Sequence, residues 1–216
     1  MKKAVIFDMD GTLLDTLPDL ARSCNYALAS LGYPARTTDE VRRFIGNGAI
    51  NLMRRAVPAD AGEAAARRAL DIFRAHYDAH SEVDTRPYPG VSELLAALHR
   101  DGWLTAIVSN KFDSAVKELN RRWFGVHVAV GESDRLRRKP APDMVDAALA
   151  ELGCTAAEAV YVGDTDVDYH TAVNSGCTPV LVSWGYRPRA ELEAVGGGCA
   201  IAAGPDELMA ALNRLR

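Results

Sequence analysis

The sequence predicts an α/β fold whose parallel sheet is interrupted, near its start, by a purely helical insertion. The apolar run 5–7 is bounded by turn residues and is typical of a buried parallel strand. After residue 86, short apolar strands alternate with helices, which favours a parallel sheet with right-handed crossovers. Between residues 16 and 85, the apolar positions recur only at helical spacing, so no strand is expected there.

The inserted segment opens with a helix for which Thr16 is the expected N-cap and Gly32 the expected end. Thr37 and Glu40 then offer a capping box for a second helix. The stretch 46–48 contains two glycines and is expected to break that helix.

A long alanine-rich helix is expected at 60–80, and the proline-rich joint 86–90 ends the helical segment. We therefore expect two domains: a discontinuous core of residues 1–15 and 86–216, and an inserted helical domain of residues 16–85. Both joints are expected beside the carboxyl ends of the strands, where the reactive groups of open α/β sheets collect. An insertion at this place is suited to act as a lid.

The remaining strands and helices of the core follow from the apolar pattern after the joint. Strands are expected at 104–109, 126–130, 159–163, 179–182 and 199–202. The helices between and after them are expected at 91–100, 114–122, 142–152, 166–175 and 206–215. The strand that ends before Asp8 is expected to join the same sheet.

Length and composition are ordinary for a soluble globular protein, and the charge favours a small-molecule partner. The chain has 216 residues, of which 48% are hydrophobic and 25% charged, and its net charge of −4 offers no basic surface for nucleic acid or an anionic membrane. No apolar run is long enough to span a membrane, and the four cysteines form no Cys-x-x-Cys pair. We expect a cytoplasmic monomer or homodimer with reduced, buried thiols.

Two carboxylates, Asp8 and Asp10, stand directly after the first strand. Alternate spacing along an extended segment places both on one side, and Gly11 lets the backbone turn away. Two neighbouring carboxylates repel each other unless a cation neutralises them, and Mg²⁺ typically binds one or two carboxylates together with substrate phosphate. A plain turn-capping role explains one such aspartate more easily than two.

Polar residues also follow the other predicted strands. Ser109 and Asn110 can donate hydrogen bonds to phosphoryl oxygens, although a Ser-Asn pair alone more often caps a turn. Lys139 lies in a basic, proline-bounded loop that could equally be a solvated patch, or could supply a cation to the site. Asp164 follows another strand, and Asp166 is the expected N-cap of the next helix, so Asp164 is the better metal ligand of the two. Asp168 lies in the first turn of that helix.

These groups, in this order, resemble the four motifs of the haloacid dehalogenase superfamily, over the whole length of the chain. The resemblance rests on Asp8-Met9-Asp10-Gly11-Thr12, Ser109-Asn110, Lys139-Pro140 and Gly163-Asp164 with Asp168. It implies a Rossmann-like three-layer core, and the helical insertion resembles the superfamily's C1-type cap. The phosphoglycolate phosphatase group is the most similar, through 10–16, 45–48, 139–142 and 184–186, whereas Asn174-Ser175-Gly176 departs from its usual Ala-Ala-Gly.

The resemblance implies a phosphatase that works through an aspartyl-phosphate intermediate. Asp8 would attack phosphorus, and Asp10 would protonate the leaving alcohol and then activate water. Mg²⁺ would be held by Asp8, the backbone carbonyl of Asp10 and Asp164, with Asp168 behind them. Ser109 and Lys139 would hold the phosphoryl oxygens, and we place Thr12 and Asn110 in the same phosphate site.

The inserted domain would then read the leaving group of a small phosphorylated metabolite. Gly46, Asn47 and Gly48 can approach a substrate closely, and Arg54 or Arg55 could pair with a carboxylate, although such arginines are as often simply solvated. The first candidate substrate is 2-phosphoglycolate.

Several alternatives remain open. A pyrophosphatase and a sugar-phosphate phosphatase of the same superfamily are two of them, and a hexose-phosphate mutase would share every core residue. A dehalogenase would not need Asp10, and a phosphonoacetaldehyde hydrolase would need a cap lysine, which 16–85 lacks. A catalytically silent metabolite-binding module is the alternative from another class, and retained carboxylates at both strand ends argue against it.

Overall fold

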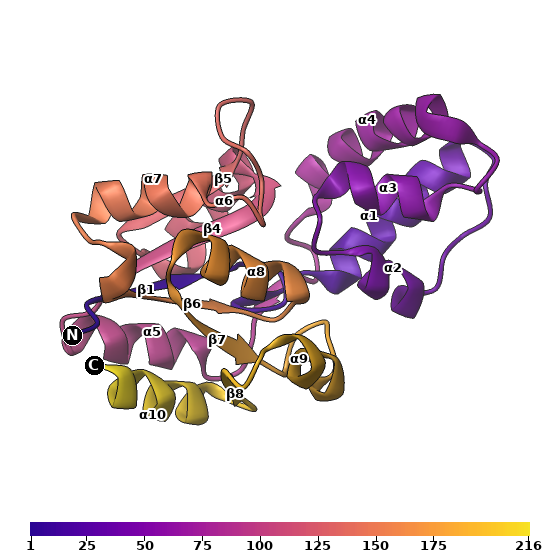
Figure 1. Cartoon of the computed structure of the whole chain (residues 1–216). Coiled ribbons are helices and arrows are strands. Elements are labelled where there is room, and N and C mark those ends of the chain that lie inside the picture. The colour runs from indigo at the N-terminus through magenta and orange to yellow at the C-terminus, as the bar shows by residue number, and fades with distance from the viewer. The chain divides into compact units, whose positions relative to one another are not determined.

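The computed structural model describes residues 1–216 and divides into two compact units (Figure 1). One unit comprises Met1–Leu14 and Pro87–Arg216, and the other comprises Asp15–Arg86. The helical unit thus spans 15–86, against the 16–85 expected for the inserted domain. Its action as a lid stays a prediction.

A six-stranded parallel sheet forms the centre of the larger unit, as the sequence predicts. The strand order is β5-β4-β1-β6-β7-β8. The strands are β1 (Ala4–Phe7), β4 (Leu104–Phe112), β5 (Val128–Glu132), β6 (Ala159–Gly163), β7 (Thr178–Val182) and β8 (Ala200–Ala202). Because β4, β1 and β6 are neighbours, the polar residues that end them meet at one edge.

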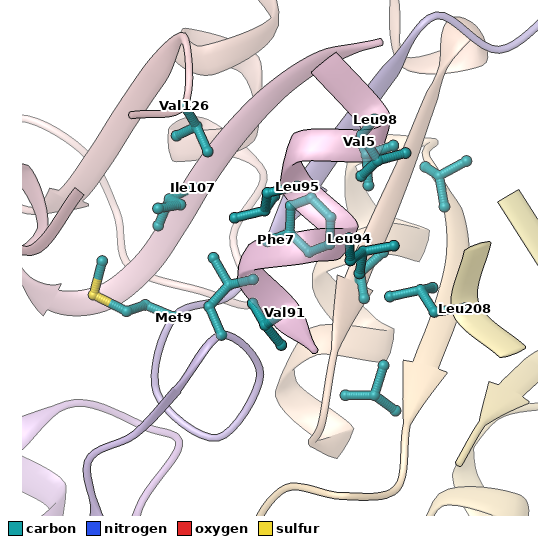
Figure 2. Packing of buried hydrophobic residues seen from close by; sticks show 14 of the residues in the cluster. Val5, Phe7, Met9, Val91, Leu94, Leu95, Leu98, Ile107, Val126 and Leu208 are labelled. Atoms are coloured by element: carbon teal, nitrogen blue, oxygen red, sulfur yellow. The ribbon is translucent and has the colours of Figure 1, made fainter. Parts of the chain in front are cut away.

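Helices cover both faces of this sheet in three layers (Figure 1). Val5 and Phe7 of β1 point to the face covered by α5 and α10, where they pack with Leu94 (Figure 2). Ala4 and Ile6 point to the opposite face, covered by α7 and α8. Successive strand residues alternate between faces, and here both faces are buried, which explains the continuous apolar run of the sequence. The elements are α5 (Val91–Arg100), α6 (Asp113–Leu119), the π-helical η1 (Asn120–Phe124), α7 (Asp143–Leu152), the short η2 (Ala156–Glu158), α8 (Asp166–Ser175), α9 (Arg189–Val195) and α10 (Pro205–Leu215).

Four features of the core differ from the sequence prediction, one being that the helix expected at 114–122 ends at Leu119 and continues as the π-helical η1. Strand β5 starts at Val128 rather than at 126, because the Asn120 side chain bonds both the N–H and the C=O of Val126. Strand β4 continues past residue 109 to Phe112, and α9 is a helix for which the apolar pattern gave no signal.

The smaller unit contains only helices apart from its ends. They are α1 (Leu17–Ser30), α2 (Thr38–Phe44), α3 (Ala49–Ala56) and α4 (Gly62–His80), while β2 (Leu14–Asp15) and β3 (Arg86–Pro87) form a two-stranded sheet. Thr16 is the N-cap of α1, but its side chain makes no capping bond. The predicted capping box of Thr37 and Glu40 is confirmed.

The cysteines are all free, but they are not all buried. Cys24 and Cys177 are buried, whereas Cys154 and Cys199 are half-buried, so the expectation of burial is wrong for the second pair. None of the helices has the length and apolar character needed to cross a membrane.

Candidate active site

Asp8 leaves β1 with its two carboxylate oxygens in different situations. Oδ1 accepts a hydrogen bond from the Met9 N–H at 2.7 Å and an ion pair from Lys139 Nζ at 2.9 Å. Oδ2 has no hydrogen-bond partner in the protein. The residue is 7% exposed, so one oxygen is fixed and the other is available at the sheet edge.

Lys139 is the buried cation of the site. Its side chain is 2% exposed, and Nζ lies 2.9 Å from Asp8 and 2.7 Å from Asp168. Burial by itself lowers the pKa of this lysine, but the charges of Asp168 and Asp8 outweigh it and raise the pKa above the ordinary value. Lys139 therefore stays an ammonium within the site. The alternative interpretation, that it belongs to a solvated surface patch, is wrong for this residue.

Asn110 holds the loop that carries Lys139. Its Oδ1 accepts a hydrogen bond from the Lys139 N–H at 2.8 Å, and its Nδ2 donates to the Lys139 carbonyl at 3.2 Å. This positioning contact is one that the sequence did not indicate, and the predicted phosphate contact of Asn110 stays a prediction. Ser109 directly precedes it in β4 and is 2% exposed.

Asp168 orients Lys139 from the other side. Its Oδ2 accepts from the N–H of Thr165 at 3.0 Å and from its hydroxyl at 2.6 Å. Thr165, not Asp166, is the N-cap of α8, because its side chain and that of Asp168 form a reciprocal capping box. A Cβ at Gly163 would lie 2.2 Å from the Asp168 Cβ, so only glycine permits this approach.

Asp164 is fully buried at the end of β6. Its Oδ1 accepts from the Thr12 hydroxyl at 3.0 Å, and its Oδ2 accepts from the Tyr186 N–H at 2.7 Å. Thr12 thus orients this carboxylate, and its predicted phosphate contact stays a prediction. Gly11 has a φ of +87°, and a Cβ there would meet Asp164 Oδ2 at 2.4 Å, so the turn after β1 requires glycine.

The three buried aspartates could hold a metal ion. One carboxylate oxygen from each of Asp8, Asp164 and Asp168 lies within 4.8 Å of the others. Burial raises the pKa of Asp8 to about 7, with the charges of Asp168 and Asp10 adding to the rise and Lys139 opposing it. Burial, with Asp168 and Asp8, also raises the pKa of Asp164 well above its ordinary value. A hard divalent cation would remove this electrostatic cost, and an all-oxygen donor set suits Mg²⁺.

The model of the haloacid dehalogenase-like hydrolases matches residues 5–182. The chain belongs to this family. Among its relatives, the phosphoglycolate phosphatase of Aliivibrio fischeri is 33% identical over 193 residues, with 85% of each chain covered. That of Pseudomonas syringae is 36% identical over 207 residues, which cover 88% of this chain and 74% of the relative.

Solved structures of the family agree with the fold. A candidate phosphoglycolate phosphatase from Lactobacillus delbrueckii superposes with a TM-score of 0.94 at 33% identity, covering 98% of this chain and 99% of the other. CbbY from Rhodobacter sphaeroides, solved with phosphate, has a TM-score of 0.76 at 26% identity, covering 99% and 100%. The predictions of a Rossmann-like α/β fold and of a haloacid dehalogenase-type phosphatase are confirmed.

Lys111 is a charged residue of this hydrolase site for which the sequence predicts no role. Its Nζ donates to Asp10 Oδ1 at 3.1 Å, and the two side chains are 3% and 15% exposed. The available signal was its place directly after Ser109 and Asn110, at the end of the same strand. Its partner could not be inferred, because Asp10 is about a hundred residues away in sequence.

The candidate substrate residues of the helical unit are engaged within that unit. The Arg54 guanidinium makes two hydrogen bonds to Glu63, at 2.8 and 2.7 Å, and one to Asn51 at 3.0 Å. Arg55 donates to the Phe44 carbonyl at 3.1 Å. Gly46 and Gly48 have positive φ angles on either side of Asn47, as a close-approach loop would require. Their contact with a substrate stays a prediction.

Proposed function

We propose that this hydrolase is a Mg²⁺-dependent phosphomonoesterase that works through an aspartyl-phosphate intermediate. The observation that carries the proposal is the asymmetry of Asp8: Oδ1 is bound by Met9 and Lys139, while Oδ2 has no protein partner. A carboxylate is a competent nucleophile only when one oxygen is oriented and available. This arrangement supports Asp8 as the nucleophile.

In the first step, Asp8 Oδ2 forms a bond to phosphorus as the bond from phosphorus to the leaving oxygen breaks. Asp10 donates a proton to that oxygen, so the product leaves as a neutral alcohol. Lys139 balances charge on the nucleophile and on the phosphoryl oxygens, and Ser109 donates a hydrogen bond to one of them. Positioning and charge account for most catalysis in phosphoryl transfer.

In the second step, water replaces the alcohol. Asp10, now a carboxylate, removes a proton from the water. The water oxygen bonds to phosphorus as the bond from phosphorus to Asp8 breaks. Inorganic phosphate leaves and both aspartates return to their starting states. Asp8, the backbone carbonyl of Asp10 and Asp164 would hold Mg²⁺, with Asp168 adjacent, and the ion supplies charge neutralisation when bound.

We propose 2-phosphoglycolate as the substrate, which the relatives from Aliivibrio and Pseudomonas support by their names. The test is turnover with Mg²⁺ on 2-phosphoglycolate, sugar phosphates, nucleotides and pyrophosphate. The kcat/KM for 2-phosphoglycolate is expected to exceed every other value by at least about tenfold. A preference for a hexose phosphate or pyrophosphate would remove this substrate, transfer to a sugar would indicate a mutase, and no turnover at all would indicate a silent binding module.

Stabilisation by Mg²⁺ is expected to grow with pH. Without a cation, the folded-state pKa of Asp8 is about 7, against an ordinary value of 3.8. Because the folded state binds this proton more tightly than the unfolded chain, metal-free stability falls as pH rises from about 4 to about 7. Mg²⁺ requires the ionised carboxylates, so its effect should increase over the same window.

Thermal unfolding with and without Mg²⁺ measures this dependence. A Mg²⁺ concentration of about 100 times Kd stabilises the folded state by about 2.7 kcal/mol. At a pH above neutral this corresponds to a rise in Tm of about 5 to 10 °C, and near pH 5 the rise should be much smaller. Asp164→Ala should remove the rise, whereas Asp166→Asn, a half-exposed neighbour outside the carboxylate cluster, should retain it. An equal Tm rise at both pH values would contradict the assignment.

A further inference from the structure

We propose that Lys111 determines substrate specificity by pairing with a carboxylate on the leaving group. The inference rests on the proposed function, because it identifies the group that reads the part of the substrate that departs as an alcohol. Lys111 belongs to the core, whereas Arg54 and Arg55, which the sequence predicts for this role, belong to the helical unit.

The two buried lysines of the core serve different ends of the reaction. Lys139 lies against the nucleophile Asp8, at 2.9 Å, and against Asp168. Lys111 lies against Asp10 instead, with Nζ 3.1 Å from Oδ1 and only 3% of its side chain exposed. Asp10 is the group proposed to protonate the leaving oxygen, so Lys111 is the cation on the leaving-group side.

The chemistry of a small substrate then brings its carboxylate to this cation. A general acid must lie within about 2.6 to 3.2 Å of the atom that it protonates. In 2-phosphoglycolate, a single methylene separates the ester oxygen from the carboxylate, so that carboxylate must lie close to Asp10. A lysine ammonium is a compact charge on a flexible stem, which lets Nζ move from Asp10 towards the substrate.

The charge on the leaving-group side favours such a cation. Asp10 lies on the leaving-group side and is itself a carboxylate once it has donated its proton, so it repels a substrate carboxylate there. An ester with an uncharged leaving group does not meet this repulsion. The positive charge of Lys111 should therefore favour substrates with an acidic leaving group, and it should affect esters with an uncharged leaving group less.

The arginines of the helical unit are less suited to the task. Arg54 is held by both oxygens of Glu63, so its guanidinium already has a bidentate carboxylate partner. Binding a substrate carboxylate there would require that pair to break. Lys111, in contrast, pairs with Asp10, which itself takes part in the proposed reaction.

The test compares 2-phosphoglycolate with ethyl phosphate, which has a methyl group in place of the carboxylate. In the wild type, kcat/KM should favour 2-phosphoglycolate. Lys111→Met should reduce that preference by about 10- to 100-fold, chiefly through KM for 2-phosphoglycolate, since a charge-assisted contact is lost. Lys111→Arg should retain part of the preference. Lys117→Met is the matched control, because Lys117 is exposed and paired with Asp113, and it should leave the preference unchanged.

The outcomes separate this inference from the proposed substrate. An intact preference in Lys111→Met, or an equal loss on both esters, would overturn the role of Lys111 while 2-phosphoglycolate remains the substrate. A wild type without any preference would overturn both. If Arg54→Ala or Arg55→Ala loses the preference for 2-phosphoglycolate and Lys111→Met does not, the substrate carboxylate is bound by the helical unit. If the Met variant fails to fold, Lys111→Gln removes the charge while keeping a donor.

Discussion

Replacement of Asp8 by asparagine is expected to reduce kcat by a factor on the order of 10⁴ or more. The amide nitrogen or oxygen at this position cannot form the aspartyl phosphate, and it is a poorer ligand for a divalent cation. Lys139 would also lose one of its two carboxylate partners, although Asp168 would still hold it at 2.7 Å. The fold should therefore persist while turnover stops.

Steady-state phosphate release, with circular dichroism to check folding, measures this effect. Intact-protein mass spectrometry must verify that the asparagine has not deamidated, because a small aspartate fraction would restore activity. Asp166→Asn makes the same chemical change two residues from Asp164 and should keep near wild-type turnover. Comparable turnover in a verified Asp8→Asn protein would exclude Asp8 as the nucleophile.

The architecture of the core was predictable because it depends on local patterns. The continuous apolar run before Asp8 predicted a strand buried on both faces, and β1 is buried at all four positions. The alternation of strands and helices predicted the parallel sheet. Boundaries were less predictable where a side chain takes the place of strand-to-strand hydrogen bonds. Asn120, six residues before Val126, bonds both backbone groups of Val126, and β5 starts only at Val128.

The candidate site was predictable in its residue types but not in its pairings. Clustered aspartates at strand ends indicated Asp8 and Asp164, because few other roles need carboxylates there. The contacts of Asn110 with Lys139, and of Lys111 with Asp10, join the end of β4 to segments that are far from it in sequence. No local spacing encodes such contacts, and they appear only when neighbouring strand ends are brought together.

Lys139→Met is expected to remove most activity and also to destabilise the protein at neutral pH. The side chain is buried between Asp8 and Asp168, so its loss leaves two carboxylates without their shared cation. Removing one partner of a buried ion pair typically costs about 3 to 5 kcal/mol of folding free energy. Loss of a charge that stabilises the phosphoryl group should lower kcat by about 10²- to 10³-fold.

The pH dependence distinguishes this electrostatic cause from simple loss of packing. Lys139 opposes the rise in the pKa of Asp8, so its removal should raise that pKa further above about 7. Because the folded state then binds the proton more tightly than the unfolded chain does, the variant should be least stable at high pH and should recover as pH falls. Denaturant unfolding at about pH 5 and pH 8 measures the difference from wild type. Arg137→Met, which removes an exposed cation two residues away, should change neither stability nor turnover appreciably. A stability loss of Lys139→Met that is equal at both pH values would indicate a packing role, and wild-type turnover would exclude this lysine from the phosphoryl site.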